Sequence, residues 1–117
     1  MSEIYPKWQK WYAWFYISQE NPFIPYTFSW QARGAEENFP SGFDDYPRAY
    51  RINEREEIHL DLQSWMVEFS TTMSLFAAAL GKEAEQENYD ALAKRIKYEL
   101  EEKLYNENVG MYADFAG

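Results

Sequence analysis

Cysteine is absent from this chain of 117 residues, and histidine occurs only once, as His59. Without cysteine there is no disulfide framework, no thiolate metal site and no cysteine nucleophile. One histidine without cysteine makes a metal site a poor hypothesis, so we expect no metal and no cofactor. For His59, which stands between Ile58 and Leu60, a structural role is the expectation.

Positive charge is also scarce, since the chain has 11 basic and 20 acidic residues and a net charge of −9. Proteins that hold nucleic acids or anionic membrane surfaces need a basic surface. No run of apolar residues approaches the length of a membrane span, and MSEIYPKWQK lacks the apolar stretch of a signal peptide. We therefore expect no nucleic-acid partner, no membrane segment and no targeting address in this chain.

Aromatic residues, in contrast, are abundant, at 20% of the chain, with 5 Trp, 10 Tyr and 8 Phe. Trp and Tyr combine a large apolar surface with a polar group that needs a partner. A site for a flat, hydroxyl-rich ligand would use this mixture. A large core, or an interface with further helices, would use it as well, so composition leaves these alternatives open. The length allows one domain at most.

Apolar residues recur at helical spacing in three stretches. The predicted helices span about 4–19, about 54–80 with Gly81 as the stop, and about 83–105. The first of these helices is apolar on more than one side, so we expect it to pack against neighbours on several sides. After the third, the chain is expected to turn at Asn108-Val109-Gly110 and to end extended.

Between the first two helices, about residues 21–53 are predicted to form a long aromatic loop. It contains SGFDDYPRAY, in which the adjacent carboxylates of Asp44 and Asp45 repel each other if both are ionised. In a dry site one of them would keep its proton, as the acid of a glycosidase does, and Arg48 could hold the other ionised. The alternative is a simple turn, for which the same residues are well suited.

The second motif is EIHLDLQSW, residues 57–65. On a helix, Glu57 and Asp61 would share a face that Trp65 continues. Two carboxylates that accept sugar hydroxyls and an indole that stacks on a sugar ring would make a sugar-binding edge. The alternative is an acid favoured by the helix dipole, followed by a core tryptophan.

Together the two motifs resemble the signature of glycoside hydrolase family 63. Members typically carry Ser-Gly-Leu-Asp-Asp-Tyr-Pro-Arg-Ala and then Glu-Arg-His-Leu-Asp-Leu-x-x-Trp; here Phe43 replaces the Leu and Ile58 replaces the Arg. Upstream, FSWQAR resembles a further family motif and keeps Trp30 and Arg33. The closing NVGMYADF resembles the stretch that ends a helical hairpin in these enzymes, so the resemblance covers essentially the whole chain.

The resemblance implies an all-α fold, part of an (α/α)6 toroid with a long aromatic catalytic loop, and a chain 1–117 that is a fragment of the catalytic domain. Family members are inverting exo-α-glucosidases, and the eukaryotic enzyme trims the terminal α-1,2-linked glucose from N-glycan precursors in the endoplasmic reticulum. Asp44 matches the general acid of related toroidal enzymes, whereas the family's catalytic base lies downstream of position 117. The implied substrate-binding residues are Trp30, Arg33, Phe43, Asp45, Arg48, Glu57, Asp61 and Trp65.

The partners that follow are an oligosaccharide or α-glucoside substrate and the rest of the toroid, and the chain alone is expected to be inactive. Two alternatives stay open. One is a helical sugar-binding or assembly module without chemistry. The other is a related toroidal glycosidase, trehalase-like or a bacterial member of family 63, with another substrate.

Overall fold

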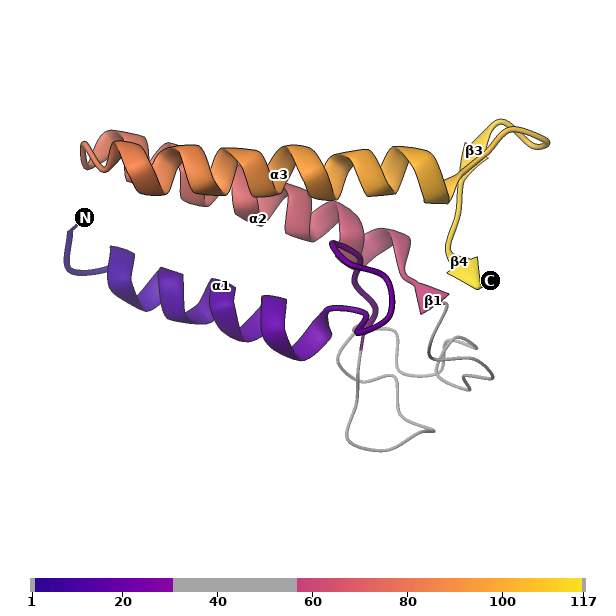
Figure 1. The fold of residues 1–117 in the computed structure, drawn as a ribbon, viewed down its shortest axis with the longest axis horizontal. Helices are drawn as coiled ribbons and strands as arrows, with labels where there is room; N and C mark the ends of the chain where they lie inside the picture. Colours follow the sequence, from indigo (N-terminus) through magenta and orange to yellow (C-terminus); the bar gives the residue numbers. More distant parts are fainter. Residues whose placement is uncertain (1, 31–56, 117) are drawn as a thin grey trace.

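The computed structural model describes residues 2–30 and 57–116, and every element below lies in these ranges (Figure 1). Most of the described chain is helical, which confirms the class expected from the sequence. The helices are α1 (Tyr5–Gln19), α2 (Leu60–Ala79) and α3 (Glu83–Leu104). The strands are two residues each: β1 (Glu57–Ile58), β2 (Tyr105–Asn106), β3 (Met111–Tyr112) and β4 (Phe115–Ala116).

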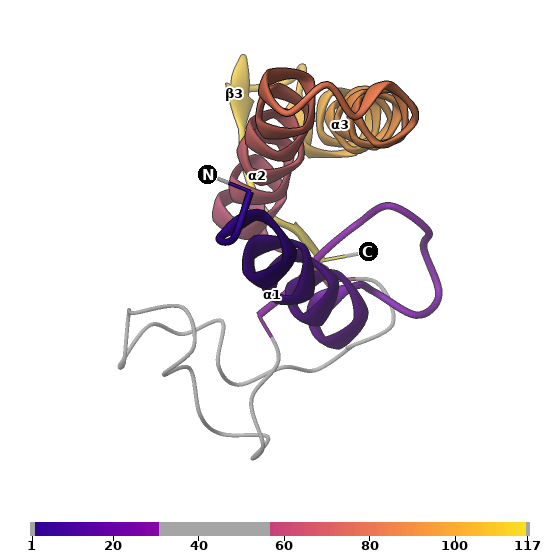
Figure 2. The ribbon, with the colours of Figure 1, turned by 90° about the vertical axis from the view of Figure 1, so that its left-hand side faces the viewer.

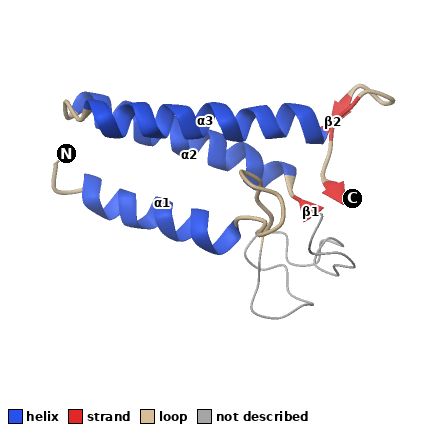
Figure 3. Cartoon of the chain, in the orientation of Figure 1, coloured by secondary structure: helices blue, strands red, loops and turns tan. Residues whose placement is uncertain are grey.

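The short strands form two antiparallel pairs near one end of the helices (Figure 3). Strands β2 and β3 form the hairpin after α3, whose turn contains Gly110 at a φ of 68°. Strand β4 pairs with β1, with Ile58 opposite Phe115. This second pair brings the end of the described chain back to the residues that precede α2.

Helix α2 begins later than the sequence predicted, at Leu60 rather than near residue 54. Glu57 and Ile58 form strand β1, and His59 is still extended, with φ −94° and ψ 120°. The backbone of this stretch is occupied by distant partners, because β1 pairs with β4 and the His59 N–H donates to the carbonyl of Phe28 at 2.9 Å. Tertiary hydrogen bonds therefore override the helical spacing of residues 57–59.

Helices α2 and α3 form an antiparallel hairpin closed at Gly81, which has a φ of 71°. The Gly81 N–H donates to the carbonyl of Ala78 at 3.1 Å, and the Lys82 N–H donates to that of Ala77 at 2.9 Å. These two bonds are the Schellman pattern, in which a left-handed residue, usually glycine, ends a helix. The expected stop at Gly81 is confirmed.

Helix α1 lies alongside α2 (Figure 2). Aromatic rings make many of the contacts between the two helices. The ring of Phe69 on α2 lies 5.1 Å from that of Tyr12 and 5.6 Å from that of Trp11, measured between centroids. Edge-on ring contacts of this kind add to the burial of apolar area. The buried core comprises Tyr5, Tyr12, Phe28, Leu62, Met66, Met73, Ala77, Tyr89 and Ile96.

Large apolar side chains also lie on the surface of α1 and α2. Trp14 is 59% exposed and Ile17 is 80% exposed on α1, and Leu75 is 66% exposed on α2. Helix α3 differs, because its outer face carries ion pairs such as Lys94 with Asp90 at 2.8 Å. Exposed apolar side chains can mark an interaction surface where they form a contiguous patch. The predicted neighbours of α1 and α2 remain a prediction.

No helix within residues 2–30 and 57–116 has both the length and the apolar character needed to cross a bilayer.

Candidate functional site

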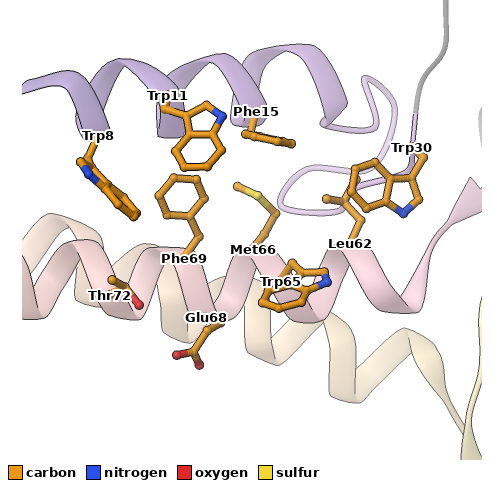
Figure 4. A pocket seen from close by; sticks show the side chains of 10 residues that line it. All are labelled: Trp8, Trp11, Phe15, Trp30, Leu62, Trp65, Met66, Glu68, Phe69 and Thr72. Atoms are coloured by element: carbon orange, nitrogen blue, oxygen red, sulfur yellow. The ribbon is translucent and has the colours of Figure 1, made fainter. Parts of the chain in front are cut away.

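Helices α1 and α2 line a cavity of about 430 Å³, and Trp30 closes one end of it (Figure 4). The cavity is mostly aromatic and aliphatic, and the charged side chain on its wall is that of Glu68. Indole faces of this kind suit the apolar face of a sugar ring or another apolar surface. The lining residues are Trp8, Trp11, Phe15, Trp30, Leu62, Trp65, Met66, Glu68, Phe69 and Thr72.

Trp30, which lines the cavity, is bonded to Asp61, which is not one of the lining residues. The indole Nε1–H of Trp30 donates to Oδ2 of Asp61 at 2.9 Å, between residues 31 positions apart. Asp61 lies in the first turn of α2, where the helix dipole favours a negative charge. An aromatic face and a carboxylate of fixed direction thus lie side by side.

His59 lies directly behind this pair and is only 1% exposed. Its Nδ1 accepts the backbone N–H of Trp30 at 2.9 Å. Its Nε2 lies 3.5 Å from Oε2 of Glu57, which is itself largely buried. The backbone of Trp30 is therefore tied to the start of α2 by an imidazole, in addition to the indole bond to Asp61.

Gln63, one turn into α2, fixes the segment that leads to Trp30. Its Oε1 accepts the backbone N–H of Phe28 at 2.9 Å. Its Nε2 donates to two carbonyls, those of Tyr26 at 2.9 Å and Ile96 at 3.0 Å. One fully buried amide thus joins the segment before Trp30 to both α2 and α3, and its donors and acceptor are all used.

Tyr26 is held in a left-handed conformation, with a φ of 61°. Such a conformation is costly for a bulky side chain and persists only where surrounding contacts fix it. Its N–H donates to Oε2 of Glu20 at 3.2 Å, and the guanidinium of Arg95 lies 5.3 Å from its ring centroid. Arg95 also pairs with the buried carboxylate of Glu99 at 2.9 Å. The bend before Trp30 is therefore held by contacts from Glu20, at the end of α1, and from Arg95 on α3.

The end of the described chain contributes one more contact to the start of α2. The Oδ1 of Asp114 accepts the N–H of Leu60 at 2.8 Å. It satisfies one of the backbone donors that a helix leaves open in its first turn. Asn21 adds a bond from its Nδ2 to the carbonyl of Glu57 at 3.0 Å. The residues before and at the start of α2 are thus held from three segments of the chain.

Tyr5 and Tyr12 belong to the buried core. Burial raises the pKa of Tyr12 to about 12, and the nearby Tyr89 acts in the same direction, whereas the hydrogen bond with Ser70 lowers it. Burial and the carboxylate of Glu85 likewise raise the pKa of Tyr5 above its ordinary range. These phenols stay neutral at physiological pH and are hydrogen-bonding core groups.

Four of the predicted substrate-binding residues lie in the described chain. Trp30 and Trp65 line the same cavity, and Trp30 is bonded to Asp61. The expectation that Glu57 and Asp61 share a helix face is wrong, because Glu57 belongs to strand β1 and its carboxylate lies beside His59. The other predicted site residues lie outside the described residues: Arg33, Phe43, Asp44, Asp45 and Arg48.

Sequence reasoning missed two residues that build this site, Gln63 and Asp114. Gln63 reads as one more polar position on a helix, and Asp114 lies 54 residues from the backbone N–H that it binds. Neither carries a local signal for its partner. Within residues 2–30 and 57–116, no group of three or more His, Cys, Asp or Glu side chains is arranged to hold a metal ion.

The chain is similar to known proteins over most of its length. The family model of the glycosyl hydrolase family 63 C-terminal domain matches residues 1–117. Over 97% of its length the chain is 28% identical to a probable mannosyl-oligosaccharide glucosidase of Schizosaccharomyces pombe, and over 90% it is 35% identical to a mannosyl-oligosaccharide glucosidase of Arabidopsis thaliana. It covers 15% and 13% of these two relatives.

A third similar protein is the mannosyl-oligosaccharide glucosidase of Saccharomyces cerevisiae, which is 26% identical over 97% of the chain and of which the chain covers 16%. These matches place the chain among the glycoside hydrolases. More narrowly, the chain belongs to glycosyl hydrolase family 63, since the family model covers it from end to end.

Proposed function

We propose that this chain is part of the catalytic domain of an inverting exo-α-glucosidase that removes the terminal α-1,2-linked glucose from N-glycan precursors. The observation that carries the proposal is the bond between the Trp30 indole and Asp61 at the end of a cavity that Trp65 also lines. It joins an aromatic surface for a sugar ring to a carboxylate that can accept sugar hydroxyls. Family membership and the names of the relatives supply the reaction class.

In this proposal Asp44 is the general acid. An inverting glycosidase uses one carboxylic acid to protonate the leaving oxygen and one carboxylate to activate water, roughly 6.5–9.5 Å apart. Asp45 and Arg48 shape the surroundings of Asp44, and Phe43 and Arg33 complete the substrate site. The base is a glutamate that the family resemblance assigns to a part of the catalytic domain outside this chain, so the chain carries the acid half of the reaction.

The surrounding architecture that we propose is an (α/α)6 toroid, with 1–117 as one fragment of it. The antiparallel hairpin of α2 and α3 supports this arrangement, as do the exposed apolar side chains on α1 and α2. The proposed partners are therefore the remaining helices of the same polypeptide and a glucose-terminated oligosaccharide. For the eukaryotic processing enzyme, the compartment implied by the family is the endoplasmic reticulum.

The test of the acid is Asp44→Asn in the complete enzyme that contains this chain. We expect kcat on an α-1,2-linked diglucoside to fall roughly 10²–10⁴-fold, because the amide cannot donate the proton, while substrate affinity is kept. Asp90→Asn, on the exposed face of α3, is the matched control and should leave kcat unchanged. Near wild-type turnover of Asp44→Asn would contradict the assignment.

The initial anomer of the product tests the reaction type. Proton NMR should show β-glucose first, because an inverting enzyme turns an α-linkage into a β-product. Early α-glucose would exclude an inverting mechanism. Preferred hydrolysis of α,α-trehalose over the α-1,2-linked diglucoside would favour the trehalase-like alternative, and the isolated 117-residue chain should hydrolyse neither.

A further inference from the structure

His59 stands where two distant segments of the chain meet, the start of α2 and the segment that ends at Trp30. Its backbone N–H donates to the carbonyl of Phe28 and its carbonyl accepts the N–H of Gln63, both at 2.9 Å. Its Nδ1 accepts the N–H of Trp30 at 2.9 Å, and its side chain is 2% exposed. The ring therefore has a defined orientation between the start of α2 and the segment that ends at Trp30.

The bond to Trp30 defines which ring nitrogen carries the proton. A backbone N–H is always a donor, so Nδ1 must present its lone pair to Trp30. The proton of the neutral ring then sits on Nε2, which lies 3.5 Å from Oε2 of Glu57. A carboxylate at that distance favours this tautomer, much as acidic partners orient histidines at other sites. Glu57 thus supports the acceptor role of Nδ1.

Trp30 is consequently held at two points that are two residues apart at the start of α2. His59 holds its backbone, and Asp61 accepts its indole N–H at 2.9 Å. If the backbone of Trp30 moved, the indole could not keep its bond to Asp61 without changing its own position on the cavity wall. The direction of the Asp61 carboxylate and the position of the indole therefore depend on an acceptor at Nδ1 of His59.

We propose, on the basis of the proposed function, that His59 is a positioning residue for the pair of Trp30 and Asp61 that binds the sugar. It acts through Trp30 to set the indole face and the carboxylate of Asp61 that meet the terminal glucose, and it does not itself touch the substrate. The buried imidazole is needed for its acceptor atom and not merely for its volume. A side chain with an acceptor at the same place should therefore replace it.

Two substitutions distinguish the role of Nδ1 from that of Nε2. In His59→Asn, the short side chain brings Oδ1 close to the place of Nδ1, so an acceptor for the Trp30 N–H is kept. In His59→Gln, the longer side chain brings its amide to the place of Nε2, near Glu57, and the acceptor for Trp30 is lost. His59→Leu keeps the approximate volume and provides neither group.

The experiment measures kcat and KM on an α-1,2-linked diglucoside for these variants of the complete enzyme, with unfolding temperatures measured in parallel. We expect KM of His59→Asn within about threefold of the parent, and KM of His59→Gln and His59→Leu raised about tenfold or more, with smaller changes in kcat. A purely structural role would lower stability and the amount of active enzyme, but the KM values of His59→Asn and His59→Gln would then be the same.

A second readout uses the complete enzyme, labelled with ¹⁵N at histidine and tryptophan, with the signals of His59 and Trp30 assigned by substitution. The imidazole signals should show a non-protonated Nδ1 and a protonated Nε2, and the indole signal of Trp30 should keep its position in His59→Asn and shift in His59→Gln. Equal KM values for Asn and Gln, or a protonated Nδ1, would overturn the positioning role while the proposed function stands. A parent enzyme that does not hydrolyse α-glucosides would instead overturn the proposed function itself.

Discussion

The two ends of helix α2 are fixed in different ways. At the C-terminal end, Gly81 and Lys82 bond to carbonyls within the same turn, so the closure is local and uses backbone atoms alone. At the N-terminal end, the bonds come from Asp114, from the segment around Phe28 and from Trp30, which lie far away in the sequence. The end held by distant segments is the end that carries the candidate site.

This difference explains what each end can do. A local closure determines where the chain reverses but brings no further side chains together. A non-local closure gathers side chains from several segments into one place, at the cost of ordering all of them. The contrast predicts that changes at the N-terminal end disturb both stability and sugar binding, whereas changes at the C-terminal end disturb stability alone.

The largest effect is expected for Gln63→Leu. The change leaves three backbone groups in the interior without their side-chain partner, those of Phe28, Tyr26 and Ile96. Each such loss costs about 1 kcal/mol or more, so the free energy of unfolding should fall by about 3 kcal/mol. Urea denaturation measures it. Gln86→Leu, at a half-buried position on α3, is the control and should cost less than about 0.5 kcal/mol.

The next effect is expected for Asp114→Ala. It removes the acceptor for the Leu60 N–H and should lower the free energy of unfolding by about 1.5 kcal/mol. Because the same segment pairs with β1, KM for an α-1,2-linked diglucoside should rise as well. Asp114→Asn keeps an acceptor oxygen and should lose less in both measurements. Equal losses for Ala and Asn would show that the hydrogen bond is not what holds this end.

Gly81→Ala tests the opposite end of α2. No atom lies within 4 Å of the position that a Cβ would take, so the cost comes from the left-handed φ of 71°. We expect a loss of about 1 kcal/mol in thermal or urea unfolding, and a smaller loss for Gly81→Asn. Neither variant should change KM. A rise in KM comparable to that of Asp114→Ala would remove the distinction between the two ends.

The smallest effect is expected for Tyr12→Phe, in the middle of α2's contact with α1. At neutral pH the loss should be about 0.5 kcal/mol, from the bond with Ser70. The pKa of Tyr12 is raised to about 12 in the folded chain. The contribution of this phenol to the free energy of unfolding is therefore fully present below pH 10. It declines between pH 10 and 12, because the unfolded state loses this proton first. The variant should show a shallower decline in urea unfolding over this interval.

The local features of the fold could be predicted from the sequence. Helical spacing and a glycine stop predicted the position of the α2–α3 hairpin, because both signals lie within the segments that they describe. The start of α2 could not be predicted, because strand β1 depends on a pairing with Phe115 and Ala116 near the other end of the described chain. Spacing alone therefore extended the helix over Glu57, where the structure has a strand.

The candidate site was predicted in part, and through the family motifs more than through spacing. The motifs singled out Trp30, Asp61 and Trp65, which the structure brings to one cavity and its edge. They contained no indication that Trp30 bonds Asp61, since the two lie in different motifs 31 residues apart. The supporting roles of His59 and Gln63 depend on tertiary contacts that no local pattern encodes.

The most direct measurement of the central claim is KM of Asp61→Ala for an α-1,2-linked diglucoside in the complete enzyme. If the Trp30–Asp61 pair forms the sugar-binding edge, losing the carboxylate should raise KM about tenfold or more, the value of a hydrogen bond to a charged group. Asp90→Ala, on α3, should leave KM unchanged. The same KM in both variants would contradict the account, because the contacts at the start of α2 would then stabilise the fold without binding the sugar.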